Sequence, residues 1–181
     1  MCGRYSLEPG LPEIRNILAM ISEPVKTGEI FPTDMAPVLR LEADEAMPAA
    51  MSWGFPRWDR RGATFNVRSE GALEKPIFRS ALLADRVAVP TTGYYAWHGQ
   101  AKYILKDPAN PVLYLAGFYK YVEGLPCFAI LTAEAAPGLQ RYHDRMPVLL
   151  HPCETESWVR GDAMQAVLAR PQFALEATRA G

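Results

Sequence analysis

The sequence is poor in cysteine, in net charge and in long apolar runs. Its cysteines, Cys2, Cys127 and Cys153, are an odd number without CxxC spacing, which indicates neither a disulfide framework nor a zinc site. No run approaches the ~20 apolar residues of a membrane span, and the N-terminus lacks the basic-then-apolar pattern of a signal peptide. We therefore expect a cytoplasmic monomer that binds no metal, no cofactor and no membrane.

The formal net charge of −1 argues against a generally basic protein that binds nucleic acid. The charge is unevenly distributed, however. Residues 1–50 hold four basic and eight acidic side chains, whereas residues 51–86 hold seven basic and four acidic ones. A local positive face is one interpretation, and a mixed, solvated surface is the other.

Short apolar runs separated by turn residues dominate the chain and predict strands. They lie at residues 37–41, 49–53, 64–67, 86–89, 93–97, 102–105, 112–119, 127–132 and 147–150. Helical spacing is seen at residues 11–21 and again near 70–75, 137–142 and 154–170. Strands spaced like hairpins, with few long helices between them, favour one antiparallel α+β domain over residues 1–181.

Cys2 offers unusual chemistry if an aminopeptidase removes Met1. The residue would then carry a free α-amine, with an ordinary pKa of about 7.7–8.0, beside a thiol with an ordinary pKa of about 8.5. The amine can condense with an aldehyde, and the thiol can then close a five-membered thiazolidine ring. Taken alone, a cysteine at position 2 is more often without function, so the hypothesis depends on the rest of the sequence.

Several separated segments together resemble one family, the SOS-response-associated peptidase (SRAP) family, and keep its order. The segments are MCGRY at 1–5, WGFP at 53–56, FNVRSE at 65–70, KPIFR at 75–79, GYYAW at 93–97, AGFY at 116–119 and HDRMP at 143–147. The resemblance is clearest over residues 1–150. It implies a compact α+β domain with a curved, barrel-like β core and a DNA groove.

The resemblance also implies an activity, which is the sensing of abasic sites in single-stranded DNA. In the family, the N-terminal cysteine condenses with the ring-opened deoxyribose aldehyde and forms a thiazolidine DNA–protein cross-link. Cys2 matches this nucleophile. Asn66 matches an asparagine that hydrogen-bonds near the cysteine amine and the sugar. His143 matches the family's histidine, which is suited to moving protons during ring opening and dehydration.

Other matched positions are expected to bind the DNA strand. Arg4, Arg68 and Arg145 match residues that hold phosphates, a task that guanidinium geometry suits. Trp58 is expected to stack on bases, and so is Trp53, for which a structural role in an apolar strand is the stronger alternative. The remaining matched positions, Pro32 and Thr132, lie where the family lines its pocket.

One position departs from the family pattern. The family has Gly-(Phe/Tyr)-Tyr-Glu-Trp where this chain has Ala96 in place of the glutamate. In the family that carboxylate assists proton transfer in forming, and especially in reversing, the adduct. We therefore expect cross-linking to survive and release of the adduct to be impaired. His98 would point to the same face of the strand as Ala96, and partial substitution by it is a hypothesis.

Two other functions stay open. One is an N-terminal nucleophile hydrolase or thiol peptidase, with Cys2, Asn66 and His143 as a triad-like set, whose minimal form is removal of its own N-terminal residue. The other is a non-catalytic protein that binds single-stranded DNA, which the missing glutamate makes conceivable.

Overall fold

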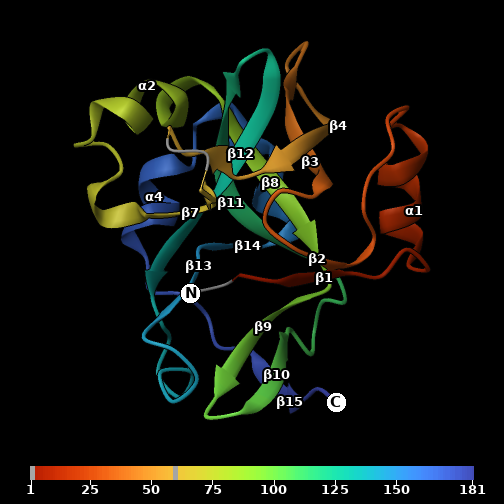
Figure 1. Ribbon diagram of the computed structural model, residues 1–181, viewed down its shortest axis with the longest axis vertical. Helices are drawn as coiled ribbons and strands as arrows, with labels where there is room; N and C mark the ends of the chain where they lie inside the picture. The colour runs from red at the N-terminus through yellow and green to blue at the C-terminus, as the bar shows by residue number, and fades with distance from the viewer. Residues whose placement is uncertain (1–2, 59–60) are drawn as a thin grey trace.

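The computed structural model describes residues 3–58 and 61–181, and within them strands close a barrel (Figure 1). In the order of their pairing around the ring, its strands are β12 (Leu125–Glu134), β4 (Glu45–Trp53), β3 (Met35–Glu42), β8 (Arg86–Thr91) and β11 (Leu113–Val122), which pairs with β12 again. β12 and β4 run parallel, and the other pairs are antiparallel. The α+β domain with a barrel-like core expected from the sequence is confirmed, with one parallel pair in its otherwise antiparallel ring.

The barrel closes tightly between β11 and β12. A Cβ atom at Gly117 would lie 2.6 Å from the carbonyl oxygen of Ala129 on β12. Atoms do not approach so closely without a shift of the backbone, so glycine is the residue that lets the two strands meet here. Buried aromatic side chains, among them Trp53, Phe118 and Phe128, fill the core.

A second sheet holds the beginning of the described chain against the GYYAW segment. Its order is β15 (Glu176–Arg179), β10 (Ala101–Lys106), β9 (Gly93–His98), β1 (Tyr5–Leu7) and β2 (Gly28–Ile30). In Figure 1, β9, β10 and β15 lie below the barrel. Tyr5 lies opposite Tyr94, and the Tyr95 amide donates to the Arg4 carbonyl at 3.0 Å. This pairing places Arg4 beside β9.

Short strands flank the barrel. β7 (Asn66–Arg68) runs parallel to β12, and β13 (Arg145–Pro147) is antiparallel to it. β14 (Leu149–Leu150) pairs with β11, and β5 (Phe55–Pro56) with β6 (Ala63–Thr64) forms a separate hairpin. The strands expected at 64–67 and 147–150 are therefore each divided in two.

The helices lie outside the barrel. They are α1 (Pro12–Ala19), the 3-10 helix η1 (Ser69–Gly71), α2 (Pro76–Ala84), the 3-10 helix η2 (Pro152–Glu154), α3 (Thr155–Arg160) and α4 (Met164–Ala169). Figure 1 shows α1 on the opposite side of the barrel from α2 and α4. The expected helix at 11–21 is confirmed as α1. The helical stretch expected at 154–170 is two helices, because Gly161 takes a left-handed conformation with φ 100° and ends α3.

Two expected helices are wrong. Near residues 70–75 the chain forms η1 and a turn, because Lys75 precedes a proline and is extended (φ −90°, ψ 112°). The helix begins only at Pro76. Residues 137–142 form turns, with Gly138 at φ 86°. Among the described residues, no helix has the length and apolar character needed to span a membrane.

Candidate functional site

The site is built around the start of the described chain, because Cys2 lies outside the described residues. Gly3 lies close to Phe65, the residue before β7. A Cβ atom on Gly3 would be 3.9 Å from the ring of Phe65. Phe65 precedes Asn66, the first residue of β7, and Arg4 is fixed to β9 by its carbonyl. These contacts bring the segments around residues 3, 66 and 96 together.

Arg4 is held by aromatic rings and by a carboxylate. Its guanidinium lies 4.4 Å from the ring centroid of Phe31 and 5.4 Å from that of Trp97, and it forms an ion pair with Glu29 at 2.9 Å. Lys102 also contacts Glu29, at 2.5 Å. The hydrogen bond from Lys102 lowers the pKa of Glu29, outweighing the effect of burial, and the charge of Arg4 lowers it further. A phosphate that binds Arg4 would compete with this carboxylate.

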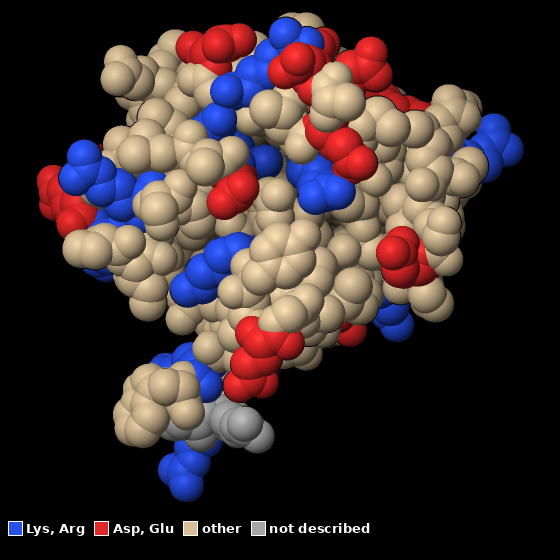
Figure 2. Space-filling view, turned by 90° about the horizontal axis from the view of Figure 1, so that it is seen from above, with Lys and Arg blue, Asp and Glu red and all other residues tan. Residues whose placement is uncertain are grey.

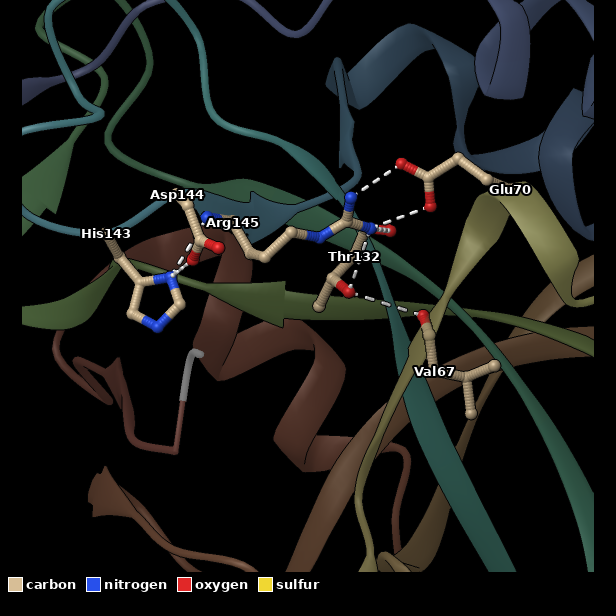
Figure 3. Close-up of polar contacts among 6 residues, drawn as sticks. All are labelled: Val67, Glu70, Thr132, His143, Asp144 and Arg145. Carbon is tan, nitrogen blue, oxygen red and sulfur yellow. Dashed lines mark hydrogen bonds and ion pairs between the residues drawn. The ribbon is translucent and has the colours of Figure 1, made fainter.

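Arg145 is bound more tightly (Figure 3). Its guanidinium forms a bidentate pair with Glu70, at 2.6 and 2.8 Å, and donates to the carbonyl of Thr132 at 2.5 Å. Hydrogen bonding to Arg145 lowers the pKa of Glu70, so this acid stays ionised near neutral pH. Arg145 therefore clamps η1 to β12 and β13. Thr132 is fully buried beneath it, with its hydroxyl 3.5 Å from the Val67 carbonyl.

Arg68 occupies the end of β7, in register with Thr132, and its side chain is exposed. It lines a hollow of about 460 Å³ together with Glu70, Glu134, Gln140, Asp144 and Arg145. Acidic side chains thus share this hollow with the arginines. Figure 2 likewise shows basic and acidic side chains interspersed on the face it presents, without one large area of a single sign. Arg86, one of the basic residues in the 51–86 segment, is buried and adds nothing to a positive face.

His143 stands at the start of the HDRMP segment and is partly exposed. Its Nδ1 lies 2.9 Å from the backbone amide of Arg145 and 2.6 Å from Oδ1 of Asp144 (Figure 3). Burial lowers the pKa of His143; nearby positive charge, including Arg145, acts in the same direction, and Asp144 opposes it. The neutral ring is therefore favoured, and in that form Nδ1 accepts from the Arg145 amide.

Ala96 and His98 lie on β9, at alternate positions. Ala96 pairs with Tyr103 of β10 and is nearly buried. The His98 ring packs edge-on against Tyr142 at 6.3 Å, and its Nδ1 lies 2.6 Å from the carbonyl oxygen of Arg141. The loop that carries His143 therefore also contacts His98.

Contacts and strand register join most of the expected site residues into a closed path that includes Gly3. Each member contacts the next, pairs with it, or lies beside it on one strand or loop. In order, the members are Gly3, Phe65, Asn66, Arg68, Thr132, Arg145, His143, Tyr142, His98, Ala96, Tyr95 and Arg4. The path thus links the residue that follows Cys2 to segments more than 130 residues away in sequence.

Expected residues outside this path differ in their surroundings. Trp53 is fully buried: its indole nitrogen donates to the Phe65 carbonyl at 3.0 Å, and its ring packs edge-on against Tyr5. It has no surface with which to stack on a base, so the structural alternative holds. Trp58 is 94% exposed and, with neighbours from the β5–β6 hairpin, lines a hollow of about 610 Å³. Pro32 lies half-buried in the turn that follows Phe31.

The sequence did not single out several residues that shape the site. Glu70 and Asp144 stand inside the quoted FNVRSE and HDRMP segments, so a search of those segments for charged partners could have found them. Glu29 had no such signal, because its partners Arg4 and Lys102 are 25 and 73 residues away in sequence. Among the described residues, no group of three His, Cys, Asp or Glu side chains is arranged to hold a metal ion.

Comparison with known proteins identifies the family. Residues 1–179 match the family model described as SOS response associated peptidase (SRAP). The chain belongs to the SRAP family. It is 33% identical over 142 residues to an abasic site processing protein of Saccharomyces cerevisiae, covering 71% of this chain and 38% of that protein. The chain thus spans well under half of the yeast relative's length.

Bacterial SRAP relatives match over more of their length. The abasic site processing proteins YoaM of Bacillus subtilis and YedK of Escherichia coli are each 26% identical to this chain; the alignments cover 88% of this chain and 79% and 80% of those proteins. A crystal structure of a Bordetella bronchiseptica protein matches with a TM-score of 0.79 at 21% identity, over 99% of this chain and 100% of that one. This likeness supports the barrel fold.

Proposed function

We propose that this SRAP protein captures abasic sites in single-stranded DNA as a covalent adduct of Cys2. The observation that supports the proposal is the path of contacts and strand pairs that links Gly3, the residue after Cys2, to a histidine, an asparagine and arginines of the family motifs. The names of the relatives support the same activity, since each is called an abasic site processing protein.

The chemistry needs only groups that the chain and the lesion supply. After removal of Met1, the Cys2 amine attacks the aldehyde carbon of the ring-opened deoxyribose, and water leaves to form an imine. The thiol sulfur then adds to the same carbon and closes a thiazolidine ring. A C–N and a C–S bond form, one water is released, and no oxidant or reductant is required.

Each neighbouring side chain has a role in this proposal. Asn66 hydrogen-bonds to the sugar or the amine, and His143 moves or donates protons at the reacting oxygen. Arg68, whose side chain is exposed, is the first phosphate contact. Arg4 and Arg145 bind phosphate in competition with Glu29 and Glu70, and Thr132 and Pro32 shape the pocket wall. Trp58 adds stacking on a flanking base, worth about 1–3 kcal/mol.

A denaturing gel tests the proposal. Purified protein is mixed with a single-stranded oligonucleotide that contains one abasic site, and its intact mass is measured first to establish that Met1 is absent. We expect a heat-stable shifted band that disappears with Cys2→Ala and with an oligonucleotide that lacks the abasic site. Binding without a covalent band would instead indicate a non-catalytic DNA-binding protein, and cleavage of peptides without an adduct would indicate a hydrolase.

The missing family carboxylate gives a prediction about release. Alanine at position 96 cannot transfer protons, and general acid–base groups contribute about 10²- to 10⁴-fold to rates. We expect Ala96→Glu to speed release of the DNA from a purified adduct by at least about tenfold. Ala96→Gln is the matched control, because it has nearly the same volume and no titrating group. Equal release from the alanine, glutamine and glutamate proteins would contradict the prediction.

A further inference from the structure

Glu29 lies between two positive side chains that come from different segments of the second sheet. One of its carboxylate oxygens, Oε2, is 2.9 Å from Nη1 of Arg4, and the other, Oε1, is 2.5 Å from Nζ of Lys102. All three side chains are partly exposed, and Glu29 is the most exposed of them, at 36%. Each oxygen of this carboxylate thus binds a different cation at a place that solvent can reach.

Aromatic rings hold both cations in place independently of the carboxylate. The Arg4 guanidinium lies 4.4 Å from the ring centroid of Phe31 and 5.4 Å from that of Trp97. Nζ of Lys102 lies 4.2 Å from the centroid of the Tyr95 ring. Because the faces of these rings attract positive charge, the two cations would keep their positions if the carboxylate turned away.

The Tyr95 hydroxyl is a third donor to this carboxylate. Hydrogen bonding from Lys102 is the main cause that lowers the pKa of Glu29; the charges of Lys102 and Arg4 and a hydrogen bond from Tyr95 act in the same direction, and burial opposes them. Burial and the charge of Glu29 raise the pKa of Tyr95, so the hydroxyl keeps its proton at neutral pH and can donate. Three donors therefore converge on one anion.

These donors share one face of the second sheet. Tyr95 and Trp97 lie at alternate positions of β9, and Lys102 is the partner of Trp97 on β10. Ala96, where the family has its carboxylate, points to the opposite face of β9. Glu29 is therefore not a replacement for that missing group, and its contacts with cations need another explanation.

The strand that carries Glu29 can release it at little cost. β2 has three residues and is the outermost strand of the second sheet, where it pairs with β1 alone among the described strands. Ion pairs between partly exposed groups add little to folding stability. Turning the Glu29 side chain toward solvent would leave the barrel untouched and the cations free to bind another anion.

We propose that Glu29 occupies a phosphate site, and that a phosphodiester group of the DNA strand replaces it there, held by Arg4 and Lys102 together. The inference rests on the proposed function, and it adds Lys102 to the residues expected to bind the strand. A phosphodiester resembles a carboxylate in its single negative charge and its two acceptor oxygens. The guanidinium and the ammonium group suit both anions, so ion pairs are exchanged and no covalent bond changes.

Reversible binding tests the exchange. Fluorescence anisotropy of an undamaged single-stranded oligonucleotide gives the Kd of the wild type and of Glu29→Gln, which keeps the side-chain size and removes the charge. We expect the variant to bind at least about threefold more tightly, because the phosphate no longer competes with an internal carboxylate. Glu45→Gln, on an exposed residue at the start of β4, changes the net charge equally and should keep the wild-type Kd. Equal tightening in both variants, or none in Glu29→Gln, would overturn the proposal.

A second substitution isolates Lys102. In the Glu29→Gln background Lys102 has lost its ion pair, so its remaining partner is the phosphate. We expect Lys102→Gln to weaken binding at least about threefold in that background. Lys106→Gln, on an exposed residue of the same strand, removes one positive charge as well and should leave the Kd of the Glu29→Gln protein unchanged. An unchanged Kd with Lys102→Gln would overturn the role of Lys102.

A measurement on the unaltered protein needs no DNA. In an NMR titration of ¹³C-labelled protein with inorganic phosphate at constant ionic strength, we expect the signals of Glu29 Cδ and Lys102 Cε to shift along one shared binding curve. A binding curve at Lys102 without a change at Glu29, or no shift at either, would contradict the exchange.

The outcomes also separate this inference from the proposed function. A Cys2-dependent cross-link in a protein whose Kd is unaffected by Glu29→Gln would overturn the phosphate site alone. Shared phosphate shifts in a wild type that forms no Cys2-dependent band would overturn the proposed capture of abasic sites and support the phosphate site.

Discussion

At the scale of single residues, the arginines expected to bind phosphate are already engaged with carboxylates. Arg4 pairs with Glu29 and Arg145 with Glu70, and both acids have lowered pKa values because of these contacts and that of Lys102. Partly exposed ion pairs of this kind contribute little to folding stability, typically about 0–1 kcal/mol. Their greater consequence is for the proposed function, since a DNA phosphate would compete with a carboxylate that the protein itself supplies.

The charge beside His143 gives a prediction at this scale. Asp144 opposes the lowering of the His143 pKa that burial causes, so Asp144→Asn should lower that pKa further. The physical reason is that the imidazolium loses an opposite charge, while the asparagine amide oxygen can still accept from Nδ1–H. An NMR titration of the His143 Cε1 proton measures the value. A higher or unchanged pKa in the variant would show that the contact with Asp144 does not stabilise the protonated ring.

At the scale of elements, a buried arginine joins two helix ends. The Arg86 guanidinium donates to the carbonyls of Leu82 and Leu83 in α2 and to those of Trp158 and Val159 in α3. These carbonyls lie at helix C-termini, where intrahelical partners are missing and a positive charge is favourable. Gly161 leaves space for the group: a Cβ atom there would lie 2.5 Å from Nη2 of Arg86.

Loss of this contact should destabilise the fold. Arg86→Met keeps an unbranched apolar side chain but leaves buried carbonyls without donors, which costs about 1–3 kcal/mol per unsatisfied group. We expect the free energy of unfolding to fall by about 3 kcal/mol in urea denaturation. Arg79→Met, on the exposed surface of α2, is the matched control and should stay within about 0.5 kcal/mol of the wild type. A loss below about 1 kcal/mol for Arg86→Met would contradict the role described.

The elements that sequence reasoning found and missed differ in what stabilises them. Barrel strands such as β11 and β12 carry apolar runs of their own, and α1 has an amphipathic pattern, so both were predictable. β1, β2 and β15 are three or four residues long and exist because a neighbouring strand offers hydrogen bonds, which local pattern cannot reveal. The same holds for the site, because residues inside local motifs could be found from the sequence, whereas Glu29, whose partners are distant in sequence, could not.

At the scale of the whole molecule, the fold brings together site segments that are far apart in sequence. The protein that carries them is nearly neutral. The barrel brings β7, β12 and β13 together, and the second sheet adds β1 and β9. With a formal charge of −1 and acidic groups beside the arginines, little long-range attraction to DNA is available. Retention of the lesion would then depend on the covalent bond more than on electrostatic affinity.

This view predicts a weak dependence of reversible binding on salt. For single strands the slope of log K against log salt is about −0.7 for each phosphate neutralised, so Arg4, Arg68 and Arg145 together give about −2. Fluorescence anisotropy of an undamaged single-stranded oligonucleotide, titrated at several KCl concentrations, measures it. Arg68→Gln should reduce the slope by about 0.7, because that arginine is exposed and is proposed to contact a phosphate, whereas Arg79→Gln on α2 should leave it unchanged. A slope of about −5 or steeper would mean that a broad basic surface binds the DNA, because the three arginines of the site cannot supply it.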